Sequence, residues 1–160
     1  MYIHTFKFIQ SRNLTDSQKF FIKYPNHEQI PTTADKLKYF RYKKSLLQRE
    51  VAEYAGIDRS TYINYESNNL DYYPIEKLIK IAELFEIDVK LLLDDYNYFL
   101  YKGQGNQIRR LRKELNLTQN EFGQLYGATA GTVKRWENNK IKISKAMWNY
   151  IFNFPTNILY

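Results

Sequence analysis

The chain has 160 residues, of which 44% are hydrophobic and 17% aromatic, and a formal net charge of +7 at pH 7. This hydrophobic content is enough for packed cores and excludes a chain that is disordered throughout. Cysteine is absent, which excludes disulfides and Cys-ligated zinc. No apolar run approaches the roughly 20 residues that span a membrane, and residues 1–7 lack the pattern of a signal peptide. We therefore expect a cytoplasmic protein away from the membrane, most simply a bacterial or phage one.

The excess positive charge is concentrated in the last third of the chain. Residues 1–35 carry a net charge of +1 and residues 36–106 a net charge of zero, whereas residues 107–160 carry nine basic and three acidic groups, a net of +6. A basic segment beside a neutral one favours a polyanionic partner. Solubilising surface charge is the alternative explanation.

Residues 1–33 are the least patterned part and are predicted to form an N-terminal arm. The alternation of residues 2–9 hints at a strand, and Thr15 can cap a short helix that carries Phe20, Phe21 and Tyr24. We expect these aromatic side chains to pack on the helical domain that follows. An arm that touches DNA or a partner subunit is the alternative.

Residues 34–95 predict a first domain that consists only of helices. Thr32 or Thr33 can cap its first helix, which ends near residue 44. A second helix from about residue 47 to 55 is followed by Gly56, where the chain needs a left-handed residue to turn. Asp58 is expected to cap the third helix with its side-chain oxygen, and that helix ends near residue 66.

Two further helices complete the predicted first domain. Pro74 suits the first turn of a fourth helix, and Asp88 can cap a fifth that carries residues 89–93. Residues 96–105 are predicted to link the two halves of the chain, with a flexible point at residues 103–105, which read Gly-Gln-Gly. Residues 96–101 are too aromatic for a free tether, and we favour packing against one or both domains over a DNA role for them.

The helix-turn-helix unit of the first domain is repeated in a second domain, residues 106–160. Five residue identities recur 71 positions later: Gln48, Glu50, Gly56, Thr61 and Glu66 reappear as Gln119, Glu121, Gly127, Thr132 and Glu137. A repeat that keeps its register through a whole helix-turn-helix unit indicates that the chain contains two copies of the same supersecondary motif. No room remains for a full fifth helix, so this domain is expected to lean on the first domain or on another subunit.

Both repeats resemble the XRE helix-turn-helix family, which includes the Cro proteins and the lambdoid phage repressors. The residues that carry the resemblance are an apolar pair, an arginine, a Gln-x-Glu stretch, a glycine turn and a final aromatic-Glu pair. In the first repeat these are Leu37, Phe40, Arg41, Gln48, Glu50, Gly56, Tyr65 and Glu66. In the second they are Ile108, Leu111, Arg112, Gln119, Glu121, Gly127, Trp136 and Glu137. The resemblance implies an all-α fold of two tandem lambda-repressor-like domains after a short arm.

Four features depart from the family pattern. Leu47 stands where a Thr or Ser cap is usual, so the start of that helix is expected to be less well satisfied. Ser45 and Asn116 replace a glycine at the end of the first helix of each repeat. Tyr62 takes a core position of Ile or Val, which would move its helix slightly outward. Gly123 replaces the alanine at the closest crossing of two helices; it still fits, at some entropic cost.

The resemblance also implies roles for individual residues, because the second helix of the motif enters the major groove in this family. Base reading falls to Arg59, Ser60, Ile63 and Asn64 in the first repeat, and to Ala130, Gly131, Lys134 and Arg135 in the second. Phosphate contacts fall to Gln48, Gln119, Thr132, Asn139, Lys140 and Lys142. Structural ion pairs are expected between the first helix and the end of the third: Arg41 with Glu66, and Arg112 with Glu137.

These assignments predict a sequence-specific double-stranded DNA-binding regulator, a repressor, that lies with the nucleoid. The first repeat is better equipped to read bases, and the more basic second repeat is better suited to hold the backbone. Because the two domains (the two DNA-binding heads of the chain) carry unlike base-reading residues, one chain could bind an asymmetric DNA site of two half-sites. A homodimer that binds four half-sites is the alternative arrangement. The alternative function is a module that binds a protein partner, such as an antitoxin or inhibitor.

No catalytic site, metal site or cofactor is predicted. A phosphate-binding glycine loop is missing from the sequence, and no carboxylates have the spacing of metal ligands. The two histidines, His4 and His27, lie in the poorly patterned arm and are expected at the surface without a metal role. We therefore do not expect an enzyme.

Overall fold

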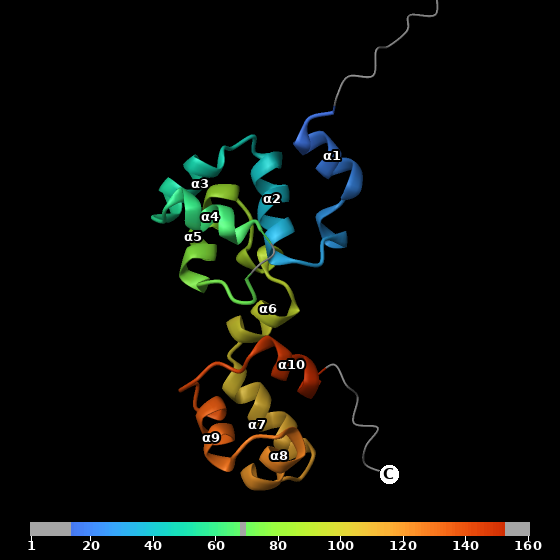
Figure 1. Cartoon of the computed structure of the whole chain (residues 1–160), viewed down its shortest axis with the longest axis vertical. Coiled ribbons are helices and arrows are strands. Elements are labelled where there is room, and N and C mark those ends of the chain that lie inside the picture. The colour runs from blue at the N-terminus through green and yellow to red at the C-terminus, as the bar shows by residue number, and fades with distance from the viewer. Residues whose placement is uncertain (1–13, 68–69, 153–160) are drawn as a thin grey trace, which may run out of the picture.

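The computed structural model describes residues 14–67 and 70–152. Within these ranges every regular element is a helix, which confirms the all-α prediction. Figure 1 shows two helical bodies at the two ends of the molecule, with the helix α6 (Asp95–Tyr101) between them. No helix in the described part of the chain is long and apolar enough to cross a membrane. The strand predicted over residues 2–9 lies outside the described residues.

A short N-terminal helix packs on the side of the first body. The helix α1 (Asp16–Lys23) begins with a capping box, in which the Thr15 hydroxyl accepts from the Gln18 amide and the Gln18 side chain accepts from the Thr15 amide. Phe20 lies edge-on to Tyr42, at 5.7 Å between ring centroids, and Phe21 lies edge-on to Tyr39 at 5.3 Å. A single 3-10 turn, η1 (His27–Gln29), then leads to the first body. The aromatic packing predicted for this segment is confirmed.

The first body is built from four α-helices, which are α2 (Thr33–Lys43), α3 (Gln48–Ala55), α4 (Arg59–Tyr65) and α5 (Ile75–Phe85). The Thr32 hydroxyl caps α2 by accepting from the Asp35 amide, and Gly56 leaves α3 with φ +63°. The core contains fully buried side chains from all four helices, among them Leu37, Val51, Tyr62 and Leu78. The predicted helices and turn of this segment are confirmed.

Two local predictions in the first body are wrong. Asp58 occupies the N-cap position of α4, but its side chain makes no capping hydrogen bond. The predicted fifth helix is only the 3-10 turn η2 (Val89–Leu92), although the Asp88 carboxylate does accept from the Lys90 amide. The turn must end early because Asp94, two residues after it, is already the N-cap of α6. The Lys36 ammonium bonds the backbone at the end of the turn, since its Nζ donates to the Leu93 carbonyl at 2.6 Å.

The aromatic segment between the bodies is the helix α6, which is fastened to both of them. Asn97 accepts from the Tyr73 amide and donates to the Asp71 carbonyl of the first body. On its other side, Tyr96 donates to the Ile143 carbonyl at 2.6 Å, and Phe99 packs against Trp148 and belongs to the second core. The aromatic residues Tyr96 and Phe99 therefore pack in the core of the second body, as favoured from the sequence, and Asn97 bonds α6 to the first body.

The second body consists of α7 (Gln104–Glu114), α8 (Gln119–Tyr126), α9 (Ala130–Glu137) and α10 (Lys145–Phe152). The Ser144 hydroxyl accepts from the Met147 amide at the start of α10, and Gly127 makes the turn after α8 with φ +69°. Tyr96 and Phe99 complete this core from α6, and Lys145 pairs with Asp94 at 3.4 Å. The second body thus leans on the helix that ends the first half, which is the first of the two predicted alternatives.

The expected flexible point at residues 103–105 is wrong for its last two residues. Gln104 and Gly105 are buried and already belong to α7. The Gln104 side chain donates to the Ile141 carbonyl at 2.6 Å and accepts from the Ile143 amide at 3.0 Å. A Cβ on Gly105 would lie 2.4 Å from the Glu137 carbonyl oxygen, so glycine serves a close backbone approach here rather than flexibility.

Candidate nucleic-acid interface

A buried ion pair ties the first helix of the first body to the end of its third. Arg41 of α2 donates to both carboxylate oxygens of Glu66, at 2.7 and 2.8 Å, and to the Leu46 carbonyl at 3.2 Å. The Gln48 amide donates to the same carboxylate at 2.9 Å. Burial opposes the charge of Arg41, but the hydrogen bonds from Arg41 to Glu66 prevail and raise the pKa of Arg41 above its ordinary value. The start of α3 and the end of α4 are therefore held in one fixed arrangement.

The second body contains the same network at the matching positions. Arg112 of α7 hydrogen-bonds both oxygens of Glu137, at 2.5 and 3.2 Å, and the Leu117 carbonyl at 2.8 Å. The Gln119 amide donates to Glu137 at 2.9 Å. Burial works against ionisation of Glu137, but these hydrogen bonds prevail and lower its pKa. The glutamate at the end of α9 is thus a charged anchor, and the network fixes how α9 lies on its body.

The helix α4 presents one polar face to solvent while its other face is buried. Arg59, Ser60, Ile63 and Asn64 are all exposed, as their i, i+1, i+4, i+5 spacing on a helix requires. Tyr62 fills the core from the opposite face and is fully buried. The structure therefore brings all four predicted base-reading residues of the first repeat together on one accessible face.

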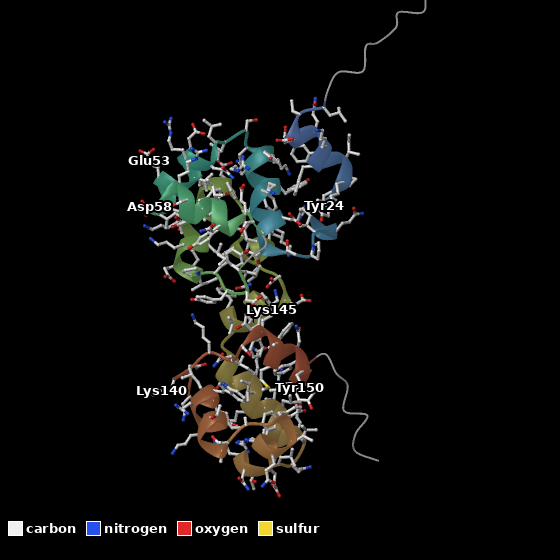
Figure 2. All side chains as sticks on the ribbon, in the orientation of Figure 1. Tyr24, Glu53, Asp58, Lys140, Lys145 and Tyr150 are labelled. Atoms are coloured by element: carbon white, nitrogen blue, oxygen red, sulfur yellow. The ribbon has the colours of Figure 1, made fainter. Side chains whose placement is uncertain are left out.

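The helix α9 presents the matching face with different chemistry. Gly131, Lys134 and Arg135 are exposed and Ala130 is half-buried, whereas Val133 and Trp136 of the opposite face are buried. In Figure 2, Asp58 at the start of α4 and Lys140 just after α9 lie along the same side of the molecule. The starts of these two faces differ: α4 begins with Arg-Ser, and α9 with Ala-Gly.

Comparison with known families identifies both bodies. Residues 34–98 match the family described as "Helix-turn-helix domain", and residues 108–148 match the family described as "Helix-turn-helix".

The chain carries two XRE-type helix-turn-helix domains in tandem.

No curated protein and no solved structure matches the chain. The two XRE-type matches make it a DNA-binding protein of the regulator type. Their residues also cover both ion-pair networks and the exposed faces of α4 and α9.

The helices α3 and α8, which precede α4 and α9, are capped differently in the two XRE-type domains. In the second, the Thr118 hydroxyl accepts from the Glu121 amide, and Glu121 accepts from the Thr118 amide at 2.7 Å, which lowers the pKa of Glu121. In the first, Glu50 accepts from the Leu47 amide at 2.7 Å, but Leu47 offers no capping oxygen. The less satisfied helix start predicted for the first domain is confirmed.

Both XRE-type domains turn through a left-handed residue where the family has a glycine. Ser45 has φ +56° and Asn116 has φ +55°. Asparagine tolerates this region better than serine does, because its short side chain can bond to nearby backbone. The second domain is therefore better adapted to this turn.

The predicted phosphate-contacting residues of the XRE-type domains do not all occupy equivalent surroundings. Gln48 and Gln119 are half-buried and hold the ion-pair networks, and Thr132 is half-buried beside the Thr129 hydroxyl at 3.0 Å. Lys140 is exposed next to α9. Two other residues turn toward the rest of the molecule: Asn139 accepts from the Gly105 amide at 3.0 Å, and the Lys142 ammonium lies 3.1 Å from the ring centroid of Tyr72.

The sequence did not reveal a concave surface at the start of α3 in the first XRE-type domain. Arg49 and Arg59 line it together with Gln48, and Asp16 of α1 forms another part of its rim. Arg49 could have been predicted from the sequence to belong to this surface, since it directly follows Gln48, a predicted phosphate-contacting residue. Asp16 could not have been predicted to lie there, because its position depends on how α1 packs against α2.

A second surface missed from the sequence is the outer face of α7. Asn106, Arg109, Arg110 and Lys113 line one shallow hollow there. Arg109 also donates to the Glu137 carbonyl at 3.2 Å, at the end of α9. The signal was the run of basic residues at 109–113, four of five positions. No cluster of His, Asp or Glu among the described residues has the form of a metal site.

Proposed function

We propose that this protein is a sequence-specific double-stranded DNA-binding transcriptional repressor that reads the major groove with two unlike recognition helices. The observation that carries the proposal is the repetition of one device: each recognition helix presents an exposed polar face and is fixed from behind by the same Arg-Glu-Gln network. A fixed helix gives base contacts without the entropic cost of ordering it on binding.

The face of α4 has the chemistry to discriminate base pairs. Arg59 can bind the O6 and N7 atoms of guanine with two hydrogen bonds, and Asn64 can pair with N6 and N7 of adenine. The exposed Ile63 can contact a thymine methyl group. Each good bidentate contact contributes about 1–3 kcal/mol of discrimination. The first head therefore supplies most of the sequence specificity in this proposal.

The face of α9 is better suited to the DNA backbone. Ala130 and Gly131 offer no side-chain hydrogen-bonding groups, whereas Lys134 and Arg135 are exposed cations. This head lies in the part of the chain that carries a net charge of +6. Lysine and arginine contacts to phosphate release counterions and give affinity that falls with salt. The second head therefore supplies mainly sequence-independent affinity.

The packed helix α6 favours one composite site over two independent ones. Its hydrogen bonds to both bodies hold the heads at a defined separation, and the two recognition helices lie toward the same side of the molecule (Figure 1). A single chain can then occupy an asymmetric operator, and a homodimer would occupy four half-sites. Repression follows when such an operator overlaps a promoter, because the bound protein excludes the polymerase.

The test is a fluorescence-anisotropy titration of a random-sequence duplex at several salt concentrations. We expect Arg135→Ala to weaken binding and to reduce the slope of log affinity against log salt by about 1. Lys80→Ala is the matched control, because Lys80 is exposed on α5 and lines neither of the basic hollows described above. Affinity that ignores salt and is unchanged in both Arg59→Ala and Arg135→Ala would refute the proposal.

A further inference from the structure

A pocket of about 500 Å³ is lined by residues of both bodies and of α6. Its walls come from α5 and the segment that leads into it, from α6 and the start of α7, and from the loop between α9 and α10. Pockets that hold small molecules have volumes of roughly 300–1,000 Å³ and occur preferentially between domains. The exposed faces of α4 and α9 and the two ion-pair networks do not line this pocket, whereas Asn139 and Lys142, which were predicted to contact phosphate, do.

The walls of the pocket are mostly apolar, and some of their side chains are unusually exposed. Ile79 of α5, Tyr101 of α6 and Ile141 of the α9–α10 loop are 39%, 38% and 36% exposed, and all three line the pocket. They come from three separate elements that converge on one concavity. Exposed apolar side chains gathered in this way indicate a site that another molecule covers.

The polar groups deep in the pocket already have partners. Asn97 is bonded to Tyr73, Asp71 and Asp94, and Gln104 is bonded to Trp136, Ile141 and Ile143. These amides hold the walls in place and offer little to an occupant. The pocket is therefore preformed, with an apolar interior.

One charged residue lines the pocket, and it is a cation. The Lys142 ammonium sits at the rim over the ring of Tyr72, so a residue of the second body contacts one of the first. No acidic side chain forms part of the lining. An occupant with an apolar part and one negative group would place the former among the isoleucines and the latter beside Lys142.

We infer that this pocket is a binding site for a small apolar organic anion, such as an aromatic or aliphatic carboxylate. Such a ligand touches both bodies at once. Its site is formed by the segments next to the two recognition helices, yet the inference does not depend on DNA binding.

The probe for the test is 8-anilinonaphthalene-1-sulfonate, an aromatic anion whose fluorescence rises on burial, titrated into the full chain. We expect saturable binding to one site, weakened at least about tenfold by Ile79→Trp, which fills the pocket with a larger side chain. Leu91→Trp is the matched control, since Leu91 is 38% exposed on η2 and lies outside the pocket. Circular dichroism of each variant checks that the fold is retained.

A second pair of titrations tests the charge. Lys142→Gln should weaken the anionic probe by about threefold and leave binding of the uncharged N-phenyl-1-naphthylamine unchanged. Lys80→Gln, at an exposed lysine of α5 outside the pocket, should change neither. Binding of the anionic probe that is absent, or equal in the wild type, Ile79→Trp and Leu91→Trp, would overturn the inference. Equal loss of both probes in Lys142→Gln would overturn its anionic part.

Discussion

Restoring the family's usual alanine in the second domain should destabilise it. Gly123 lies in α8, at its crossing with the turn that precedes α9. A Cβ at this position would meet the Ala128 carbonyl oxygen at 2.4 Å and two further backbone carbons at 3.2 Å. The first domain has Ala52 at the matching position, where it is buried without difficulty. The two domains therefore differ in how closely these segments approach.

The size of the effect follows from two opposing contributions. Replacing glycine by alanine inside a helix stabilises it by about 1 kcal/mol. Overpacking in a close-packed interior costs about 1–3 kcal/mol, and the upper part of this range applies because the contacted atoms belong to the backbone. We therefore expect Gly123→Ala to lower the free energy of unfolding of the second domain by about 1–2 kcal/mol.

Tryptophan fluorescence makes the assay specific for the second domain. The chain has two tryptophans, and both Trp136 and Trp148 are buried in the second core. Urea denaturation followed by their emission reports this domain alone. The matched control is Gly131→Ala in α9, where the new Cβ would meet only the Thr129 hydroxyl at 3.8 Å. This control should stabilise the domain by up to about 1 kcal/mol.

The sign of the change in unfolding free energy in Gly123→Ala tests whether α8 and the turn before α9 approach as closely as the structure shows. A Gly123→Ala domain that is as stable as the wild type, or more stable, would refute the reasoning. The Gly131→Ala control guards against a general effect of glycine replacement, because it is expected to shift stability in the opposite direction.

Three further changes have defined outcomes. Glu137→Ala leaves the half-buried Arg112 without its carboxylate partner and should lower the stability of the second domain by about 1.5–3 kcal/mol in urea denaturation, the range for hydrogen bonds to charged groups. Because the hydrogen bonds from Arg112 and Gln119 outweigh burial and lower the pKa of Glu137, its stabilising contribution is complete above the ordinary pKa and is lost as pH falls through the lowered one. Acid titration by tryptophan emission should therefore show a shallower loss of stability below about pH 5 in Glu137→Gln than in the wild type. The buried Tyr62 hydroxyl has no hydrogen-bond partner within the described ranges, so Tyr62→Phe should stabilise the first domain by about 0.5–1 kcal/mol, measured by circular dichroism.

Local signals were enough to predict most of the helices. The Thr32 cap, the left-handed turns at Gly56 and Gly127, and Pro74 before α5 each act over a few residues, and the repeat in the sequence aligned the two turns. These features depend on backbone chemistry that neighbouring residues determine. For this reason the elements next to them were found with bounds close to the observed ones.

Features that depend on packing between distant segments could not be predicted from the sequence. The Asp88 cap was read as the start of a helix, but the approach of α6 limits it to one turn. Gly105 was read as a flexible point, but the end of α9 lies against it. The role of Gln48 in bonding Glu66 was missed as well, because the two residues are distant in sequence and meet only in the folded domain.

The candidate site shows the same division. The residues on the exposed faces of α4 and α9 followed from the helical period once the motif was placed. The concave surface that Asp16 shares with Arg49, and the turn of Lys142 toward Tyr72, required the arrangement of whole elements. A sequence therefore indicated which helices would carry the site, and the structure was needed for the surfaces around them.

The most direct test of the central claim is selection of bound duplexes from a random pool, carried out in parallel for the wild type and for variants in each head. The proposal predicts one recovered motif for the wild type, loss of most of its sequence information in Arg59→Ala with Asn64→Ala, and retention of the motif with weaker binding in Lys134→Ala with Arg135→Ala. Equal loss of sequence information from both pairs would contradict the division of labour between the heads. Failure of the wild type to enrich any motif would contradict sequence-specific DNA binding itself.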